Sequence, residues 1–233
     1  MSVADLLADA RRDGRTALTE AEAKDLFATV GIPVPDHAVA GDAEAAVQAA
    51  AEIGYPVVAK VASPDVLHKS EWGDGVGVQV GLDDASAVRR AADSILDAGE
   101  AAGLDVEVLV EQQLATDAGT ELIVGGLRKR TFGPVVLVGL GGVFTEVFED
   151  TAHRLAPLSA DEAHDAIAEL QAVELLRGFR SRPPADLDAL AGTVATVGDL
   201  VAEYDEIAEV DVNPLLAEES GVVALDALVS LVD

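Results

Sequence analysis

Segments with helical periodicity alternate along this chain with short runs of apolar, β-branched residues. A capping-box pattern at Thr19 and Glu22 predicts a helix that ends at Gly31, ahead of Pro33 and Pro35. Further helices are predicted from N-cap residues and breakers, and they run from Asp42 to Gly54, from Asp83 or Asp84 to about Ala101, and onward from Ser159 and from Asp186.

The apolar runs predict strands. They are Tyr55 to Ala62, Gly75 to Val80, Val106 to Val110, Glu121 to Val124, Val135 to Leu140, a segment around Arg154, Ile207 to Leu216 and Val222 to Val232. The runs between residues 106 and 140 are mostly too apolar for burial on one side only, so we expect them in a covered sheet. The alternation lacks a repeat of fixed period and predicts a mixed α/β (α+β) fold, with a candidate seam near residues 103–114.

Composition narrows the possible functions. The 233 residues, 50% of them hydrophobic, suffice for one large domain or two small lobes. The 15 Lys and Arg against 43 Asp and Glu give a net charge of -28, which argues against nucleic acid as a partner, because phosphate backbones are bound by cationic side chains. The absence of cysteine excludes disulfides, iron–sulfur clusters and thiol nucleophiles. No apolar run approaches the roughly 20 residues of a membrane span, and residues 1–10 lack a signal-peptide pattern, so we expect a cytoplasmic protein without a membrane partner.

The acidic residues are spread along the whole chain, and lysine occurs only at positions 24, 60, 69 and 129. Such a composition keeps a protein soluble where salt screens charge repulsion, so we interpret it as a halophilic adaptation. An acidic docking surface for a basic partner is the alternative, although docking surfaces are patches rather than whole-chain biases.

Several standard motifs are absent from the sequence. No Lys follows a Gly as in a P-loop, and neither glycine-rich segment, at 73–77 or at 139–142, has the dinucleotide-binding spacing. No serine has the flanking glycines of a nucleophile elbow, and no two histidines have helical metal-ligand spacing. Any chemistry must come from other segments.

Two segments carry cations that suit a phosphate. Lys60 ends the apolar run Val57-Val58-Ala59-Lys60, where burying an ammonium costs free energy unless an anion meets it; a surface lysine at a strand edge is the alternative. His68 lies in the loop Ser63-Pro64-Asp65-Val66-Leu67-His68-Lys69-Ser70, and an imidazole can carry a phosphoryl group when cations and backbone donors hold its charge. A surface histidine with an incidental neighbour is the alternative.

Two further segments suit a nucleotide and a metal ion. Gly139 to Glu146 follows a strand, and its glycines let backbone N–H groups approach an anion, although a tight structural turn explains it equally well. In Glu209-Val210-Asp211-Val212-Asn213-Pro214, alternate residues share one strand face, and Asp226 on the next strand can reach the same side. Converging carboxylate and amide oxygens suit Mg2+, and solvated acidic residues beside a proline turn are the alternative.

In this order, the segments resemble the ATP-grasp domain of ADP-forming acyl-CoA synthetases, specifically the β subunit of ADP-forming acetate–CoA ligase, a relative of the succinyl-CoA synthetase β subunit. The resemblance runs from about Leu18 to the C-terminus. Its signatures are Lys60 with the His68 loop, Val110-Glu111, Glu121-Leu122-Ile123-Val124-Gly125, Phe132-Gly133-Pro134, Gly141-Gly142 with Glu146, Arg154-Leu155-Ala156-Pro157 and Asp211-Val212-Asn213-Pro214.

The resemblance implies an ATP-grasp fold, with a nucleotide in the cleft between two lobes. We expect residues 20–112 to form the smaller lobe, and residues 1–19 plus 113–233 to form the larger lobe with the glycine-rich loop and the metal site. The implied reaction converts acyl-CoA, ADP and phosphate into the free acid, CoA and ATP. An α subunit, in an α2β2 complex, is implied to bind CoA and to carry a first phosphohistidine.

The resemblance also implies roles for single residues. His68 would be the second phosphoryl carrier and pass the group to ADP. Lys60 would contact the nucleotide phosphates and Glu111 the adenosine moiety. The other nucleotide-site positions are Glu121, Gly141, Gly142 and Glu146, and those for Mg2+ are Asn213, Asp226 and Asp211, the last of which holds the metal or the phosphohistidine. Arg154 matches a family position whose role is open.

One position departs from the family pattern. Asp74 separates Gly73 from Gly75, where the family has two adjacent glycines, and its carboxylate would repel phosphates unless it points away. A non-catalytic, nucleotide-binding regulatory subunit and an ATP-grasp carboxylate–amine ligase are the alternative functions.

Overall fold

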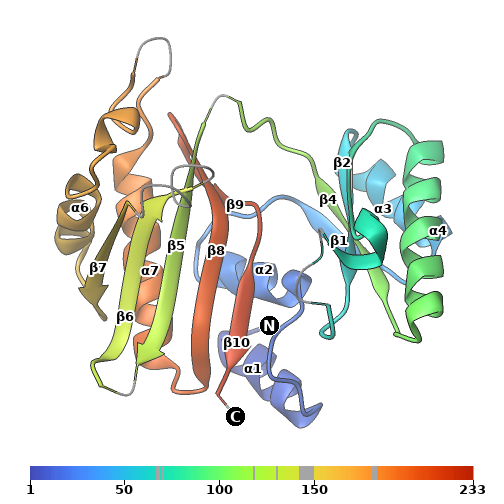
Figure 1. Cartoon of the computed structure of the whole chain (residues 1–233), viewed down its shortest axis with the longest axis horizontal. Helices are drawn as coiled ribbons and strands as arrows, with labels where there is room; N and C mark the ends of the chain where they lie inside the picture. The colour runs from blue at the N-terminus through green and yellow to red at the C-terminus, as the bar shows by residue number, and fades with distance from the viewer. Residues whose placement is uncertain are drawn as a thin grey trace. The chain divides into compact units, whose positions relative to one another are not determined.

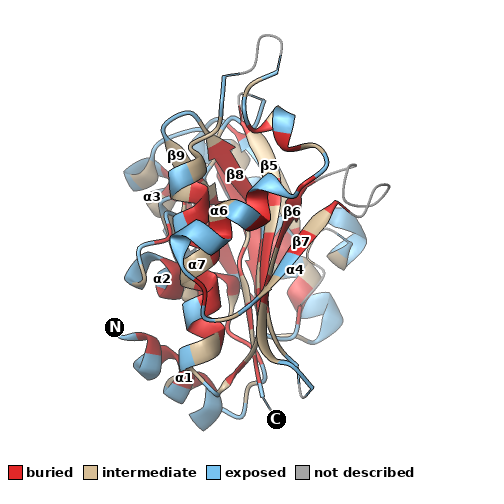
Figure 2. Cartoon of the chain, turned by 90° about the vertical axis from the view of Figure 1, so that its left-hand side faces the viewer, coloured by how far each residue is buried: buried red, intermediate tan, exposed pale blue. Residues whose placement is uncertain are grey.

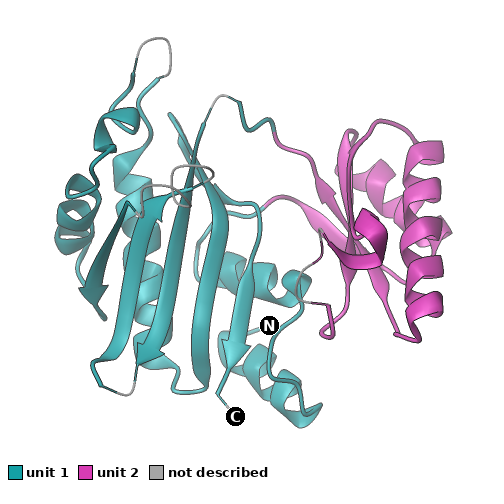
Figure 3. Ribbon diagram, in the orientation of Figure 1, with its two compact units in different colours: residues 1–34, 115–233 teal, residues 35–114 magenta. Residues whose placement is uncertain are grey.

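The chain divides into two compact units, which Figure 3 shows in different colours. The computed structural model describes residues 1–66, 69, 71–117, 119–129, 131–141, 150–179 and 183–232. Unit 1 comprises residues 1–34 and 115–233, and unit 2 comprises residues 35–114. Each unit has its own antiparallel sheet and its own hydrophobic core.

Unit 2 is a four-stranded sheet with two helices packed on one face (Figure 1). Its strands lie in the order β1-β4-β2-β3 and are β1 (His37–Ala40), β2 (Val57–Ala62), β3 (Val78–Leu82) and β4 (Glu107–Gln112). Its helices are α3 (Ala43–Ile53) and α4 (Ala85–Ala102), and a 3-10 turn, η1 (Trp72–Gly75), precedes β3.

The helices of unit 2 begin and end where the sequence predicts. Asp42 and Asp84 each accept a hydrogen bond from a backbone N–H in the first turn of their helix. Gly54 and Gly103, with φ of 100° and 69°, end the two helices. Of the two candidate caps for α4, Asp84 is therefore the one used.

Unit 1 contains a larger sheet in the order β10-β8-β5-β6-β7, with β9 paired to β8. Its strands are β5 (Thr120–Lys129), β6 (Gly133–Leu140), β7 (Thr151–Leu155), β8 (Ile207–Glu218), β9 (Gly221–Ala224) and β10 (Leu228–Leu231). Its helices are α1 (Val3–Arg12), α2 (Glu20–Thr29), α6 (Ala160–Ala168) and α7 (Leu187–Glu203), with a 3-10 turn η2 (Val173–Leu175). Figure 2 shows α6 and α7 on the same side of this sheet.

Burial along the strands differs between the two sheets. In β4, three consecutive residues, Val108, Leu109 and Val110, are 0% exposed, so this strand is buried on both faces as expected. In β6, Val136 and Val138 are buried, whereas Val135 and Leu137 are only partly buried. The expectation of a covered sheet therefore holds for β4 and not for β6.

Several elements differ from the sequence prediction. The predictions omitted α1, which opens with a capping box formed by Ser2 and Asp5, and β1. The strand predicted from Val222 to Val232 is two strands, β9 and β10. Between them, the Asp226 side chain accepts a hydrogen bond from the Ala227 N–H at 2.9 Å, a local bond that competes with strand pairing.

The boundary between the units also differs from the expected one. Residues 20–34 belong to unit 1, because Ala23, Leu26 and Phe27 on α2 are part of the unit 1 core. The other boundary follows Leu114, at the end of the seam expected at residues 103–114. None of the described helices combines the length and the apolar character that a membrane span requires.

Candidate functional site

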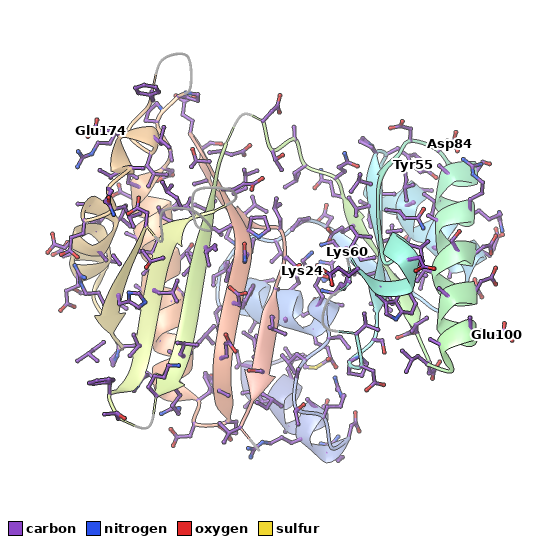
Figure 4. All side chains as sticks on the ribbon, in the orientation of Figure 1. Lys24, Tyr55, Lys60, Asp84, Glu100 and Glu174 are labelled. Carbon is purple, nitrogen blue, oxygen red and sulfur yellow. The ribbon has the colours of Figure 1, made fainter. Side chains whose placement is uncertain are left out.

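Lys60, which Figure 4 labels, lies within β2 and is paired with a buried carboxylate. Lys60 Nζ is 2.8 Å from Glu111 Oε1 on β4, and the two residues are 8% and 4% exposed. Val58 is opposite Glu111 in the antiparallel register, so Lys60 reaches Glu111 diagonally. Because a buried ammonium needs an anionic partner, the pair accounts for the buried cation, and the alternative of a surface lysine is wrong. The role expected for Glu111 at the adenosine moiety stays a prediction.

The proposed phosphoryl carrier, His68, lies outside the described residues, as do Leu67 and Ser70. The adjoining backbone is anchored to unit 2. The Trp72 N–H donates to the Lys69 carbonyl oxygen at 3.2 Å, and the Val61 N–H on β2 donates to the Gly77 carbonyl oxygen at 2.9 Å. Gly77 packs directly against the Lys69 carbonyl group, where a Cβ atom would overlap the oxygen. A glycine is therefore required at position 77 by close approach of the backbone.

Asp74, the departure from the family pattern, adopts a backbone conformation typical of glycine. Its φ is 58°, in the left-handed region, and the residue is exposed. Asp tolerates this region better than most side chains, although glycine enters it without steric cost. The substitution thus preserves a glycine-like turn at the price of some backbone strain.

Glu121 and Gly141 lie side by side at one end of the unit 1 sheet. The Gly141 N–H donates to the Glu121 carbonyl oxygen at 2.7 Å. A Cβ on residue 141 would lie 2.9 Å from the Glu121 carbonyl carbon, so only glycine fits there. The predicted nucleotide-site residues Gly142 and Glu146 lie outside the described residues.

Asp211 on β8 is partly buried and feels the charges of two other carboxylates. Burial, together with the charges of Glu209 and Asp226, raises the pKa of Asp211 to about 6 from its ordinary value of 3.8. The charge of Asp226 therefore acts on Asp211, and a metal site shared by the two residues stays a prediction. The structure also adds Glu209, whose position on the same strand face made it recognisable from the sequence.

Asn213 lies at an irregularity of β8. The register between β5 and β8 shifts between Leu122 and Val124, which are opposite Leu215 and Val212, so β8 has one extra residue there. Asn213 is exposed at this bulge. A proline inside a predicted strand, here Pro214, was the sequence signal for the irregularity.

The types of donor group near Asp211, rather than an assembled cluster, are what suit a hard divalent cation. The described residues contain no group of three or more His, Cys, Asp or Glu side chains that could hold a metal ion. Two carboxylates, Asp211 and Asp226, with the Asn213 amide are nevertheless a set that suits Mg2+, which commonly keeps water and phosphate as its remaining ligands. A cation beside Asp211 would offset the repulsion and desolvation that raise its pKa.

Two polar features of unit 1 were missed by sequence reasoning. Asp150 is 4% exposed and accepts hydrogen bonds from the Gln171 and Ala172 N–H groups at 2.8 and 2.9 Å. Nothing in its sequence context separates it from the other acidic residues. Lys24 Nζ is 2.8 Å from Glu20 Oε1 inside α2, with side chains 0% and 1% exposed, and the four-residue spacing was a usable signal.

Arg154 binds a carboxylate of its own unit. Its Nη2 and Nη1 atoms are 2.8 and 3.1 Å from the two Glu169 carboxylate oxygens. The pair joins β7 to the residue that follows α6. A bidentate pair of this kind orients the guanidinium firmly, which gives Arg154 a structural role in unit 1.

Comparisons with known proteins cover nearly the whole chain. A family model described as an ATP-grasp domain matches residues 9–231. The β subunit of ADP-forming acetate–CoA ligase I from Pyrococcus furiosus is 39% identical over 213 residues, which cover 90% of this chain and 90% of the relative. Some curated relatives are longer, and this chain spans 30% of their length.

Solved structures also match nearly the whole chain. The Ca. Korarchaeum cryptofilum dinucleotide forming acetyl-coenzyme A synthetase 1, in complex with coenzyme A, Ca-AMPCP and HgCl+, matches with a TM-score of 0.92 and 41% identity over 99% of this chain and 100% of that chain. A second structure of that synthetase contains coenzyme A and Mg-AMPPCP, and its phosphohistidine segment is described as pointing towards the nucleotide binding site. It matches with a TM-score of 0.85 and 41% identity over 98% of this chain and 99% of that chain.

Proposed function

Because the chain belongs to the ATP-grasp domain family, in the group of the ADP-forming acetate–CoA ligase β subunits, we propose that its His68 passes a phosphoryl group to Mg-ADP. The overall reaction is acyl-CoA plus ADP plus phosphate to the free acid, CoA and ATP. The observation that carries the proposal is the match over nearly the full chain to a synthetase described with a phosphohistidine segment and a nucleotide analogue. In this chain, the loop with the family signature contains His68.

The proposed transfer occurs in two steps. A ring nitrogen of His68 attacks the phosphoryl group presented by the partner subunit, so that a new P–N bond forms to His68 while the P–N bond to the partner subunit's phosphohistidine breaks and that imidazole leaves. A terminal β-phosphate oxygen of ADP then attacks the same phosphorus, the P–N bond to His68 breaks, and ATP leaves with the group. Such a transfer depends chiefly on positioning and on stabilisation of charge.

The described residues suit the charge stabilisation. Lys60 would donate hydrogen bonds to the nucleotide phosphates while Glu111, 2.8 Å away, fixes the orientation of its ammonium group. Asp211, Asp226 and Asn213 would hold Mg2+, which supplies further neutralisation of phosphate charge when bound. Glu121 and Gly141, joined through their backbones, would shape the nucleotide site beside the glycine-rich loop.

A labelling experiment tests the carrier role directly. The purified protein with Mg2+ and ATP labelled in the γ-phosphate should acquire an acid-labile, base-stable phosphoryl group, as a phosphohistidine does. His68→Ala should abolish the label, and His153→Ala, at an exposed position on β7, should retain it.

The other outcomes separate the alternative functions. Nucleotide binding without any label in the wild-type protein would favour a regulatory subunit. Ligase activity that survives His68→Ala would favour a carboxylate–amine ligase, which uses an acyl phosphate directly. Label that persists in His68→Ala would refute the assignment of the carrier.

The proposal includes a partner. We expect an α subunit that binds CoA, in an α2β2 complex, and pull-down from native extract at high salt followed by an assay with acyl-CoA, ADP and phosphate tests for it. The net charge of -28 supports a halophilic protein, so the fold and the complex should both lose stability when salt is removed.

A further inference from the structure

Unit 1 contains a cavity of about 550 Å3 whose residues have no part in the proposed phosphoryl transfer. Its walls come from the first turns of α7, the loop after α2 and the β8–β9 hairpin. Figure 2 shows α7 beside β9, and the Asp186 N–H, just before α7, donates to the Glu218 carbonyl oxygen at the end of β8 at 2.7 Å. A cavity of this volume is in the range that binds a ligand or a partner's side chain.

The polar side chains of this cavity are mainly hydrogen-bond acceptors. Glu218 and Asp186 bring two carboxylates, and Asp186 Oδ1 already accepts a hydrogen bond from the Ala189 N–H at 2.9 Å, which leaves its other oxygen for an occupant. The hydroxyl groups of Thr193 and Thr196 donate to the Ala189 and Gly192 carbonyl oxygens at 3.0 and 2.9 Å, so only their lone pairs are left for an occupant. None of the described residues that line the cavity is Lys, Arg or His. The complementary occupant is therefore a cationic donor, an ammonium or a guanidinium.

Gly192 lies in an exposed part of the cavity wall that has room for a side chain. It lies within α7, where glycine costs about 0.5–1 kcal/mol relative to alanine. A Cβ on residue 192 would meet no atom within 4 Å. By contrast, a Cβ on Gly198 of the same helix would lie 2.5 Å from Leu158 Cδ2, so packing requires glycine there. At position 192 a new side chain would therefore extend into open space, so this position is suitable for filling the cavity.

We propose that the cavity receives a basic side chain of the partner α subunit. The proposal rests on the proposed function for the existence of that partner. The cavity is open at its rim, where Gly31, Gly192 and Ser220 are exposed, so a side chain presented by another protein surface can enter. A guanidinium would match the site well, because its planar array of donors pairs with carboxylates through two parallel hydrogen bonds.

Three variants test the proposal through the affinity for the α subunit, measured at constant salt. Gly192→Met fills the cavity from a wall that has room for the new side chain, and the Kd should rise about tenfold or more. Asp199→Met places the same side chain at an exposed position of α7 that is not part of the cavity, and the Kd should stay unchanged. The double variant Asp186→Asn and Glu218→Gln removes both charges at nearly constant volume and should raise the Kd about tenfold.

Controls distinguish docking from stability. Asn caps a helix as well as Asp does, so the double variant should keep its melting temperature. Gly192→Ala should be as stable as the wild type or more stable, and ADP affinity should be the same in all variants. If Gly192→Met does not fold, the double variant decides the question.

The results also separate this inference from the proposed function. Failure of the wild-type protein to bind the α subunit would refute the proposed function. Normal binding of the α subunit by Gly192→Met and by the double variant would refute the docking site. If free agmatine binds the wild type and not the double variant while α-subunit affinity is unchanged, the cavity is a small-amine site and the partner assignment is wrong.

Discussion

Replacement of Gly77 by alanine should separate correct positioning of the His68 loop from the chemistry of the histidine itself. A Cβ at this position would overlap the Lys69 carbonyl oxygen and lie 3.1 Å from its carbonyl carbon. Carbon atoms in contact are ordinarily about 3.5–4.0 Å apart, so the Lys69 carbonyl must move by roughly 0.5–1 Å or more. That movement disturbs the Trp72 N–H bond to Lys69 and moves the residue next to His68.

The expected magnitude has two parts. Overpacking of this kind costs about 1–3 kcal/mol of stability, which lowers the melting temperature by roughly 2–4 °C for each kcal/mol. Displacement of a reacting group by about 1 Å can cost about 100-fold in rate. We therefore expect Gly77→Ala to remain folded at 25 °C but to form phosphohistidine at least about tenfold more slowly.

The assay compares phosphorylation rates well below the melting temperature of each variant. Gly41→Ala is the matched control, because it lies in the same unit, has no positive φ, and would have nothing within 4 Å of its new Cβ. Its rate should equal that of the wild type. A wild-type phosphorylation rate in Gly77→Ala would refute the inference that the contact between Gly77 and Lys69 positions the loop.

Three further changes test the candidate site. Glu111→Gln should lower the free energy of unfolding by about 3 kcal/mol, because it leaves the buried Lys60 without its anionic partner. ADP should raise the melting temperature more in this variant than in the wild type, because a phosphate of ADP replaces the missing anion beside Lys60. Equal rises in the two proteins would contradict that contact. Asp74→Gly should tighten ADP binding in titration calorimetry, because it removes a negative charge, and should raise the melting temperature, because it relieves a backbone at φ 58°. Unchanged affinity would show that the carboxylate points away from the phosphates. The ionised form of Asp211 destabilises the fold, since the pKa of Asp211, about 6, lies above its ordinary value of 3.8. Asp211→Asn should therefore raise the melting temperature at pH 8 but not at pH 4. The same substitution should abolish any rise in melting temperature that Mg2+ produces in the wild type. A gain of the same size at both pH values would contradict the raised pKa.

Local signals in the sequence were sufficient where one residue type decides the conformation. Asp42, Ser159 and Asp186 each cap the helix predicted from them. The division of the predicted C-terminal strand around Asp226 was not foreseen, because a local side-chain hydrogen bond competes there with an apolar pattern that favours a continuous strand. Likewise, the assignment of residues 20–34 to unit 1 depends on which core receives Leu26 and Phe27, and the helical pattern does not contain that information.

The candidate site shows the same division between local and tertiary information. The sequence identified Lys60 and Glu111 from separate segments, but their 2.8 Å pairing depends on the register of β2 against β4, with Val58 opposite Glu111. The pKa of Asp211 depends on its burial and on Asp226, which is separated from it by the β8–β9 hairpin. Such properties arise from strand pairing, and no window of sequence specifies them.

The placement of the lysines connects the acidic composition with the proposed chemistry. Two of the four, Lys24 and Lys60, are buried against glutamates, whereas the structure places Arg12, Arg89 and Arg177 in exposed pairs with carboxylates. At about 1 M salt the Debye length is only about 3 Å, so exposed charges contribute little attraction, whereas buried ones are screened much less. A phosphate-binding cation that must act at high salt therefore gains from burial, and burial in turn requires a counter-charge that fixes it before the nucleotide arrives. By this reasoning, Glu111 keeps Lys60 buried and charged until a phosphate takes over part of the pairing, so the proposed role of the ion pair is to prepare the phosphate contact as well as to stabilise unit 2.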